Sequence, residues 1–278
     1  MKKILYSPRE INGSIEDGFT VLIDIRDPVD YVADHIKGAI NIPEVFEYLS
    51  TSDPEGLRDL RQTFQNLFAR AGVTADKKVI FYEESMDSRY GASCRGYWLL
   101  TYLGHPDVGI LDGGFLAWRE ENLPFDNHLV TPPESNFIVN PQAGLLATKN
   151  EVFAALGNSS VILLDCRDQE EWFGLSSSPY GVDYAPRKGR IPGAIWLEWY
   201  LLMERSQKIP GFKSKKEILA ICAKLSITPD SDIIIYCFKG ARAAHTYIAL
   251  KLAGFNRLRI YFASWNEWAR DFSLPIDK

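Results

Sequence analysis

One hexapeptide, Cys-Phe-Lys-Gly-Ala-Arg at 237–242, combines residue types that suit nucleophilic chemistry. It follows an apolar run at 233–236 and precedes a helical pattern over 244–253 that ends at a glycine. We therefore expect the cysteine at the carboxyl end of a parallel strand, where open α/β sheets bind ligands. The N–H groups of the first helical turn attract anions, and Lys239 and Arg242 add positive charge. These surroundings are expected to lower the pKa of the Cys237 thiol and to make it a nucleophile at neutral pH.

The elements that must position this loop occur twice in the chain. Four blocks recur in the same order, namely 20–28 with 160–168, 35–43 with 190–198, 77–83 with 232–237, and 103–118 with 253–268. Each copy alternates short apolar strands with helical patterns, which is typical of a parallel sheet covered by helices on both faces. The sequence therefore predicts an α/β protein built from two tandem, related domains.

The domain boundaries follow from length and from local composition. A chain of 278 residues favours two domains. The polar stretch 126–144, with its three prolines, separates the two copies and is typical of a connector. We place the first domain at 1–126, the linker at 127–142 and the second domain at 143–278.

Composition argues against several classes of partner. The net charge of −5 does not favour nucleic-acid binding. The sequence has neither a signal-peptide core nor an apolar run long enough for a bilayer, so we expect a cytoplasmic protein without a membrane partner. The 4 cysteines lack the spacing of a zinc site or a disulfide framework, so reduced thiols and no metal are expected. Among them, Cys94, Cys166 and Cys222 are expected to be inert.

Five segments together resemble a known family, the rhodanese-like sulfurtransferases in their tandem two-domain form. They are 23–43, 111–118, 163–168, 189–194 and 236–242. The resemblance implies that the C-terminal domain is catalytic and that Cys237 carries a persulfide. It also implies that Phe238, Lys239, Gly240, Ala241 and Arg242 form the substrate-binding loop. Because the sulfur travels as a cysteine-bound atom, neither a metal nor an organic cofactor is expected.

The first domain departs from this pattern at the equivalent loop. Glu83 stands where the repeat alignment expects the cysteine, and the segment 83–91 carries three acidic groups. Acidic groups would repel both a thiolate and an anionic donor. We therefore predict that the N-terminal copy is non-catalytic.

The donor is expected to be small and anionic. Lys239 and Arg242 resemble the basic loop residues of enzymes that use thiosulfate, so thiosulfate is favoured, with 3-mercaptopyruvate as the alternative. The acceptor would be cyanide or a thiol, including the thiol of a protein. Family members usually place a substrate-binding arginine at the position of Glu171. The anion-binding role of that arginine must therefore be lost here or taken over by another residue. The insertion 176–190 offers Arg187, Lys188 and Arg190 as replacements, of which Arg187 is our candidate.

Three other functions remain open. Cysteine phosphatases and arsenate reductases share the fold, but their loops are one residue longer between cysteine and arginine, so the loop length here favours sulfur transfer. The chain could also be a non-enzymatic binding module, or a persulfide relay that serves another protein's cysteine.

Two further groups near the loop admit structural interpretations. Asp165 and Arg167 are expected to form a buried pair that braces the strand end against the loop. His245 could assist proton transfer, although a histidine at such a place is more often structural.

Overall fold

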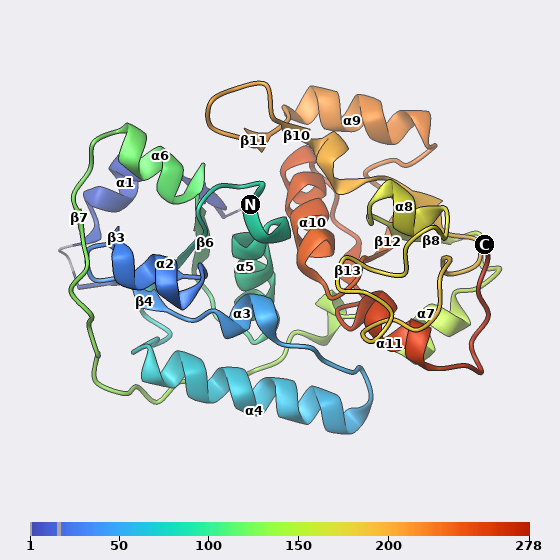
Figure 1. Cartoon of the computed structure of the whole chain (residues 1–278), viewed down its shortest axis with the longest axis horizontal. Coiled ribbons are helices and arrows are strands. Elements are labelled where there is room, and N and C mark those ends of the chain that lie inside the picture. Colours follow the sequence, from blue (N-terminus) through green and yellow to red (C-terminus); the bar gives the residue numbers. More distant parts are fainter. Residues whose placement is uncertain (1, 16–17) are drawn as a thin grey trace. The chain divides into compact units, whose positions relative to one another are not determined.

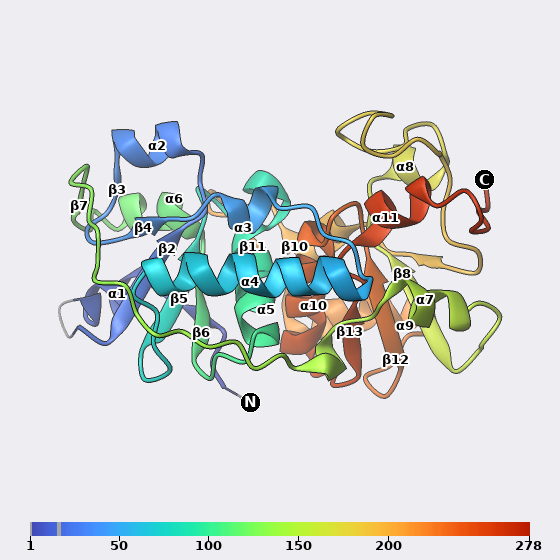
Figure 2. The same ribbon diagram turned by 90° about the horizontal axis from the view of Figure 1, so that it is seen from below.

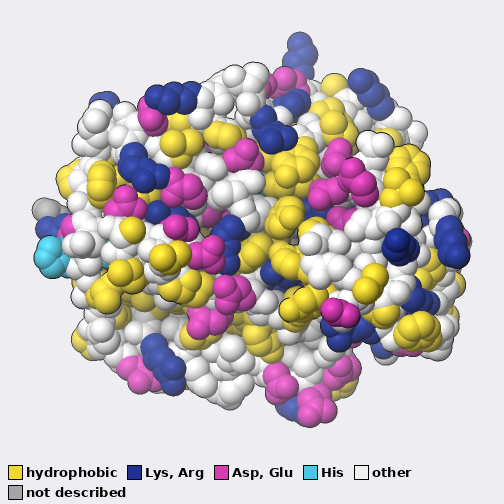
Figure 3. Space-filling model, in the orientation of Figure 1, with side chains coloured by type: hydrophobic (Ala, Val, Ile, Leu, Met, Phe, Trp, Pro, Cys, Tyr) yellow, Lys and Arg dark blue, Asp and Glu magenta, His cyan; other side chains and the backbone are white. Residues whose placement is uncertain are grey.

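The computed structural model describes residues 2–15 and 18–278, and these residues form two compact units. The first unit comprises the described residues up to Tyr48, together with Arg58–Gln142 and Arg205–Gly211. The second comprises Leu49–Leu57, Ala143–Glu204 and Phe212–Lys278. Each contains its own sheet and helices (Figures 1 and 2). Acidic and basic side chains are interspersed on the face drawn in Figure 3.

The first unit is built on a five-stranded parallel sheet with the order β1-β6-β5-β2-β4. The strands are β1 (Leu5–Tyr6), β2 (Thr20–Asp24), β4 (Ile40–Asn41), β5 (Lys78–Tyr82) and β6 (Val108–Leu111). The helices are α1 (Pro8–Asn12), α2 (Pro28–Ala33), α3 (Glu44–Glu47), α4 (Pro54–Arg70), η2 (Ser88–Tyr90), α5 (Ala92–Tyr102) and α6 (Gly114–Glu120). A small antiparallel pair joins β3 (His35–Ile36) to β7 (Phe125–Asp126).

Alternation along β5 explains why helices cover both faces of this sheet. Ile80 and Tyr82 belong to the core cluster that includes residues of α1 and α6. Phe81 points the other way, where it contacts Phe68 of α4 edge to face at 6.1 Å between ring centroids. Helix α5 approaches so closely that a Cβ at Gly96 would lie 2.5 Å from the Phe81 ring, so only glycine fits there.

The second unit repeats the design with a four-stranded parallel sheet of order β13-β12-β8-β9. The strands are β8 (Val161–Asp165), β9 (Ile195–Trp196), β12 (Asp232–Tyr236) and β13 (Leu258–Ile260), and β10 (Met203–Glu204) pairs separately with β11 (Gly211–Phe212). The helices are η3 (Ala143–Leu145), α7 (Lys149–Ala154), α8 (Gln169–Trp172), η4 (Trp199–Leu202), α9 (Lys215–Lys224), α10 (Ala241–Ala253) and α11 (Ser264–Arg270).

The same alternation organises the core of the second unit. Ile234 and Tyr236 pack with apolar residues of α7 and α11 on one face. Ile233 and Ile235 point to the opposite face, which α10 covers with α9 packed beside it. The expected fold class, two tandem α/β domains with helices on both faces of each parallel sheet, is therefore confirmed.

Helix α10 begins earlier than the sequence pattern indicated. The expected start is residue 244, whereas the helix runs from Ala241 and ends, as expected, before Gly254. Gly240 has a left-handed conformation with φ of 90°, which lets the chain turn directly from the loop into the helix. This early start places Arg242 in the first helical turn.

Two features are absent from the part of the chain that the structure describes. Within residues 2–15 and 18–278, no helix is long and apolar enough to cross a bilayer. In the same ranges, no group of three or more His, Cys, Asp or Glu side chains is arranged to hold a metal ion.

Candidate active site

Cys237 lies directly after β12, at the carboxyl edge of the second sheet. Parallel pairing aligns Tyr236 with Asp165, so Cys237 and Cys166 each come one residue beyond neighbouring strands. Both cysteines are buried and reduced. From the sequence we expect Cys166 to be inert. The strand register nevertheless places it beside the candidate nucleophile.

The loop holds the Cys237 sulfur against backbone donors. The Gly240 N–H donates to Sγ at 3.1 Å. The backbone of Cys237 is fixed on both sides, because its N–H donates to Ser264 Oγ at 3.2 Å and its carbonyl accepts from the Trp265 N–H at 3.0 Å. The side chain is therefore held with its sulfur facing the N-terminus of α10, where a negative charge is stabilised.

The electrostatics of the site favour the thiolate. Burial by itself raises the pKa of the Cys237 thiol, but hydrogen bonding from Cys166, the charge of Arg242 and the N–H groups of Ala243 and Lys239 outweigh it. The net result is a pKa well below the usual value for cysteine. At neutral pH the thiolate form is therefore favoured.

Cys166 is the partner that keeps its proton. Burial, and then the neighbouring Cys237, raise the pKa of the Cys166 thiol well above its ordinary value. Its single S–H faces two acceptors, the Tyr236 carbonyl oxygen at 3.0 Å and the Cys237 sulfur. The pair thus divides into one thiolate and one thiol, with Cys166 acting as a donor to the Cys237 thiolate.

Arg242 is enclosed by carboxylates. Its Nη1 lies 2.5 Å from Glu171 Oε2 and its Nη2 lies 3.1 Å from Glu171 Oε1. Nη1 also lies 2.9 Å from Asp168 Oδ1. Arg242 and Glu171 are each only 2% exposed, so this is a buried ion pair in the first turn of α10.

The other loop side chains pack beside Tyr180. The Phe238 ring lies 4.9 Å from the Tyr180 ring and belongs to the core cluster of the second unit. The Lys239 ammonium lies 4.7 Å from the centroid of the same tyrosine ring. Because the side chain of Phe238 lies in the core, this residue contributes only its backbone to the loop.

Asp165 and Arg167 form a buried bidentate pair. Nη2 of Arg167 lies 2.6 Å from Asp165 Oδ2, and Nε lies 2.9 Å from Oδ1. The guanidinium also donates to the Gly189 carbonyl at 2.9 Å and stacks over Trp265, 4.5 Å from the ring centroid. Trp265 donates in turn to the Cys237 carbonyl, so the pair supports the end of β8 beside the loop.

The three cations of the insertion lie elsewhere. Arg187 donates to four backbone carbonyls, including those of Trp268 at 2.6 Å and Leu274 at 2.8 Å. Its guanidinium is therefore occupied in closing the C-terminal end of α11. Lys188 donates to the Leu175 carbonyl, and Arg190 donates to the Trp172 carbonyl. None of these contacts involves the Cys237 loop, so the geometry does not support our placement of Arg187 against the donor.

His245 is enclosed by aromatic rings. Its ring stacks on Phe212 with centroids 4.6 Å apart and meets Trp199 edge to face at 5.0 Å. Among the residues that the structure describes, neither ring nitrogen has a hydrogen-bond partner. Burial lowers the pKa of His245 to about 3, so the ring is neutral at physiological pH and is a poor proton donor.

The equivalent loop of the first unit carries a carboxyl group in place of the thiol. Glu83 follows β5, is fully buried, and accepts hydrogen bonds from the Ser93 N–H and, at 2.7 Å, from its hydroxyl. Burial raises the pKa of Glu83 to about 8. This loop therefore presents a protonated carboxyl near neutral pH, which is not a nucleophile.

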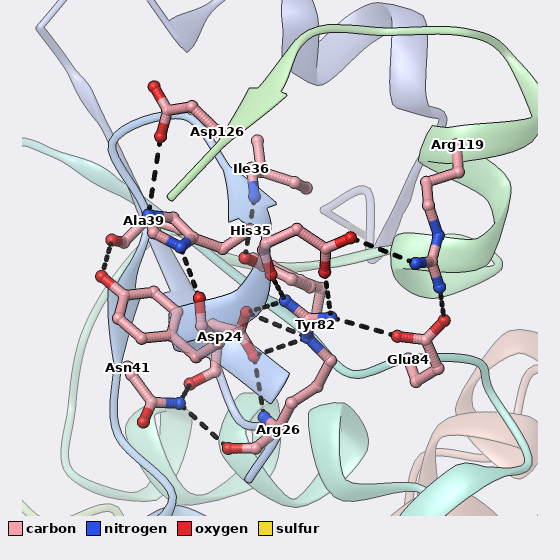
Figure 4. Close-up of polar contacts among 12 residues, drawn as sticks. Asp24, Arg26, His35, Ile36, Ala39, Asn41, Tyr82, Glu84, Arg119 and Asp126 are labelled. Atoms are coloured by element: carbon pink, nitrogen blue, oxygen red, sulfur yellow. Dashed lines mark hydrogen bonds and ion pairs between the residues drawn. The ribbon is translucent and has the colours of Figure 1, made fainter. Parts of the chain in front are cut away.

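The pair equivalent to Asp165 and Arg167 is also present in the first unit. Arg26 Nη2 lies 2.8 Å from Asp24 Oδ2, and Nη1 lies 3.1 Å from Glu84 Oε2 (Figure 4). Arg119 contacts the other oxygen of the Glu84 carboxylate. Glu84, one of the three acidic groups noted in the sequence, is therefore neutralised by two arginines.

Comparison with known proteins confirms the resemblance found in the sequence. The model of the rhodanese-like domain matches residues 7–121 and 148–271, so the chain belongs to the rhodanese-like domain family and contains two copies of the domain. Among solved structures, wild-type EanB matches with a TM-score of 0.83 and 22% identity, covering 99% of this chain and 69% of that one. At this identity the likeness shows the fold alone.

Several curated relatives match over nearly their whole length. A thiosulfate sulfurtransferase of Corynebacterium glutamicum is 32% identical over 94% of this chain and 85% of its own. A thiosulfate sulfurtransferase of Azotobacter vinelandii is 25% identical, covering 99% of this chain and 97% of its own. The sulfur carrier protein TtuD of Thermus thermophilus is 29% identical, with the same coverage of 99% and 97%.

Proposed function

We propose that this protein is a rhodanese-type sulfurtransferase that takes a sulfane sulfur from thiosulfate and passes it to cyanide or a thiol. The observation that carries the proposal is the Cys237 sulfur, held 3.1 Å from the Gly240 N–H with a lowered pKa. The names of the relatives support the same reaction class. The first unit, with Glu83 at the equivalent position, would not catalyse transfer at its loop.

The proposed reaction is a double displacement. The Cys237 thiolate attacks the outer sulfur of thiosulfate, a new S–S bond forms, and the bond to the sulfonyl sulfur breaks as sulfite leaves. The terminal sulfur of the resulting persulfide keeps the negative charge, which the backbone N–H groups of residues 238–242 stabilise. Cyanide or a thiolate then attacks that terminal sulfur and restores the Cys237 thiolate.

The proposed donor site consists of the loop backbone and its cations. We assign donor binding to the backbone of Phe238, Gly240 and Ala241 and to the charges of Lys239 and Arg242. Arg187 is left out of this site because its guanidinium is occupied by carbonyl groups at α11. Asp165 and Arg167 support the loop from the neighbouring strand without contacting the donor.

One observation favours a different donor, and another favours a protein thiol as the acceptor. The carboxylates around Arg242 reduce the attraction for a dianion, which favours a less charged donor such as 3-mercaptopyruvate. The relative named as a sulfur carrier favours a protein thiol as the acceptor. A phosphatase is disfavoured, because only four residues separate Cys237 from Arg242.

Intact-protein mass spectrometry tests the proposal directly. The protein is incubated separately with thiosulfate and with 3-mercaptopyruvate, beside Cys237→Ser and, as a matched control at another buried thiol, Cys222→Ser. We expect a gain of one sulfur from thiosulfate that cyanide removes, in the wild type and Cys222→Ser but not in Cys237→Ser. A gain of sulfur from 3-mercaptopyruvate alone would identify that compound as the donor in place of thiosulfate. If folded protein gains sulfur from neither compound, the proposal is refuted.

A further inference from the structure

Glu171 lies where it can influence which sulfur donor the loop prefers. This inference rests on the proposed sulfur transfer. Glu171 lies in α8 and is held rigidly, because its carboxylate also accepts from the Asp168 N–H at 3.3 Å. Its two oxygens take both terminal nitrogens of Arg242, at 2.5 and 3.1 Å. The planar fork of the guanidinium is thereby matched by a bidentate acceptor.

The charges at this end of the loop balance one another. Lys239 and Arg242 contribute two positive charges, while Asp168 and Glu171 contribute two negative ones. Both carboxylates lie within 2.9 Å of Arg242 Nη1. A donor that meets the Cys237 thiolate therefore meets a loop in which the charge of Arg242 is already compensated by two carboxylates. A dianion loses more by this compensation than a monoanion, since Coulomb energies scale with charge.

A purely structural role for Glu171 predicts a different effect of its substitution on the two donors. A buried carboxylate that only secures Arg242 would affect folding and the position of the loop, and both donors would respond in the same proportion. A carboxylate that sets the local charge would instead change the ratio between donors of different charge. The two roles are therefore separable by measuring that ratio.

We propose that Glu171 is a specificity-determining residue, which by holding Arg242 in a buried ion pair reduces the advantage of dianionic over monoanionic sulfur donors. Glu171 does not touch the reacting sulfur and acts through Arg242. The donors that gain relative to thiosulfate carry a transferable sulfane sulfur and a single negative charge, as in an organic thiosulfonate.

The test compares two donors that deliver the same kind of sulfur. Thiosulfate is a dianion, whereas methanethiosulfonate is a monoanion with a methyl group in place of one charged oxygen. The variant is Glu171→Gln, which keeps the shape and one acceptor oxygen. The control is Glu170→Gln, the same change at the preceding, exposed residue of α8. Values of kcat/KM are measured with cyanide as the acceptor.

Removing the negative charge of Glu171 should raise kcat/KM more for the dianion than for the monoanion, because the Coulomb energy scales with the charge of the donor. A gain of about threefold for the monoanion corresponds to a gain of about ninefold for the dianion. The ratio of thiosulfate to methanethiosulfonate therefore rises about threefold in Glu171→Gln and stays constant in Glu170→Gln. Equal effects on both donors would overturn the inference while leaving sulfur transfer in place. If folded wild-type protein accepts sulfur from neither donor, the proposed function itself fails, and the inference with it.

A measurement on the wild-type protein covers the case in which Glu171→Gln does not fold. Because Arg242 is compensated and Cys237 is itself a thiolate, kcat/KM for thiosulfate should not fall steeply as the ionic strength rises, since little net attraction remains to be screened. A steep loss with added salt, as expected for an uncompensated basic loop, would contradict the role given to Glu171.

Discussion

The thiol of Cys166 should set much of the reactivity of Cys237. Among the groups that lower the pKa of Cys237, hydrogen bonding from Cys166 is the largest, ahead of the charge of Arg242. The substitution Cys166→Ala removes the S–H donor while leaving an apolar side chain in a buried position. We expect the pKa of Cys237 to rise.

The size of this rise follows from the geometry. A hydrogen bond to a charged group contributes about 1.5–3 kcal/mol. The S–H group is a weak donor, and the Cys166 proton is shared with the Tyr236 carbonyl at 3.0 Å, so the lower end applies. About 1.4 kcal/mol corresponds to one pKa unit. At a pH below the pKa of Cys237 in both the wild type and Cys166→Ala, alkylation of Cys237 should therefore be about tenfold slower in the variant. At high pH the two rates should be equal.

Alkylation with iodoacetamide, followed across the pH range by peptide mass spectrometry, gives the pKa of Cys237 directly. Cys222→Ala is the matched control, because Cys222 is buried in α9 and its own pKa is raised to about 11. An unchanged midpoint in folded Cys166→Ala protein would refute the assignment of Cys166 as a donor. A uniform loss of rate at every pH would point instead to a displaced loop.

Three further predictions concern stability. Burial raises the pKa of Glu83 from 4.5 to about 8, so this group favours folding below pH 4.5 and loses that contribution as the pH rises to about 8. Glu83→Gln should therefore flatten the pH dependence of urea unfolding, by about 5 kcal/mol at most. Gly240→Ala should cost about 2 kcal/mol in urea unfolding and reduce persulfide formation, because φ is 90° and the new Cβ would lie 2.9 Å from the Phe262 ring. Asp165→Asn should cost about 3–5 kcal/mol in thermal or urea unfolding by leaving Arg167 unpaired, and a loss below about 1 kcal/mol would contradict a buried pair.

Much of the fold could be predicted because it depends on local patterns that the chain repeats. Apolar runs before Asp24, Glu83, Asp165 and Cys237 identify the central strands of both sheets, since a strand buried on two faces has few alternatives. The glycine at 254 correctly marks the end of α10. The start of that helix was misplaced because Gly240, which weakens a helical pattern, adopts a left-handed conformation that initiates it.

The sequence by itself determined the two-domain α/β architecture, the nucleophile candidate and the absence of a cysteine at position 83. Only the tertiary structure decided the partners of these groups. Glu171 is 71 residues from Arg242 along the chain, and Arg187 is 81 residues from Trp268, so no local pattern could reveal either contact. Charge compensation depends on distance in space and on burial, both of which arise when strands from remote segments pair. For this reason Arg242, a basic loop residue in the sequence, is half of a buried ion pair in the fold.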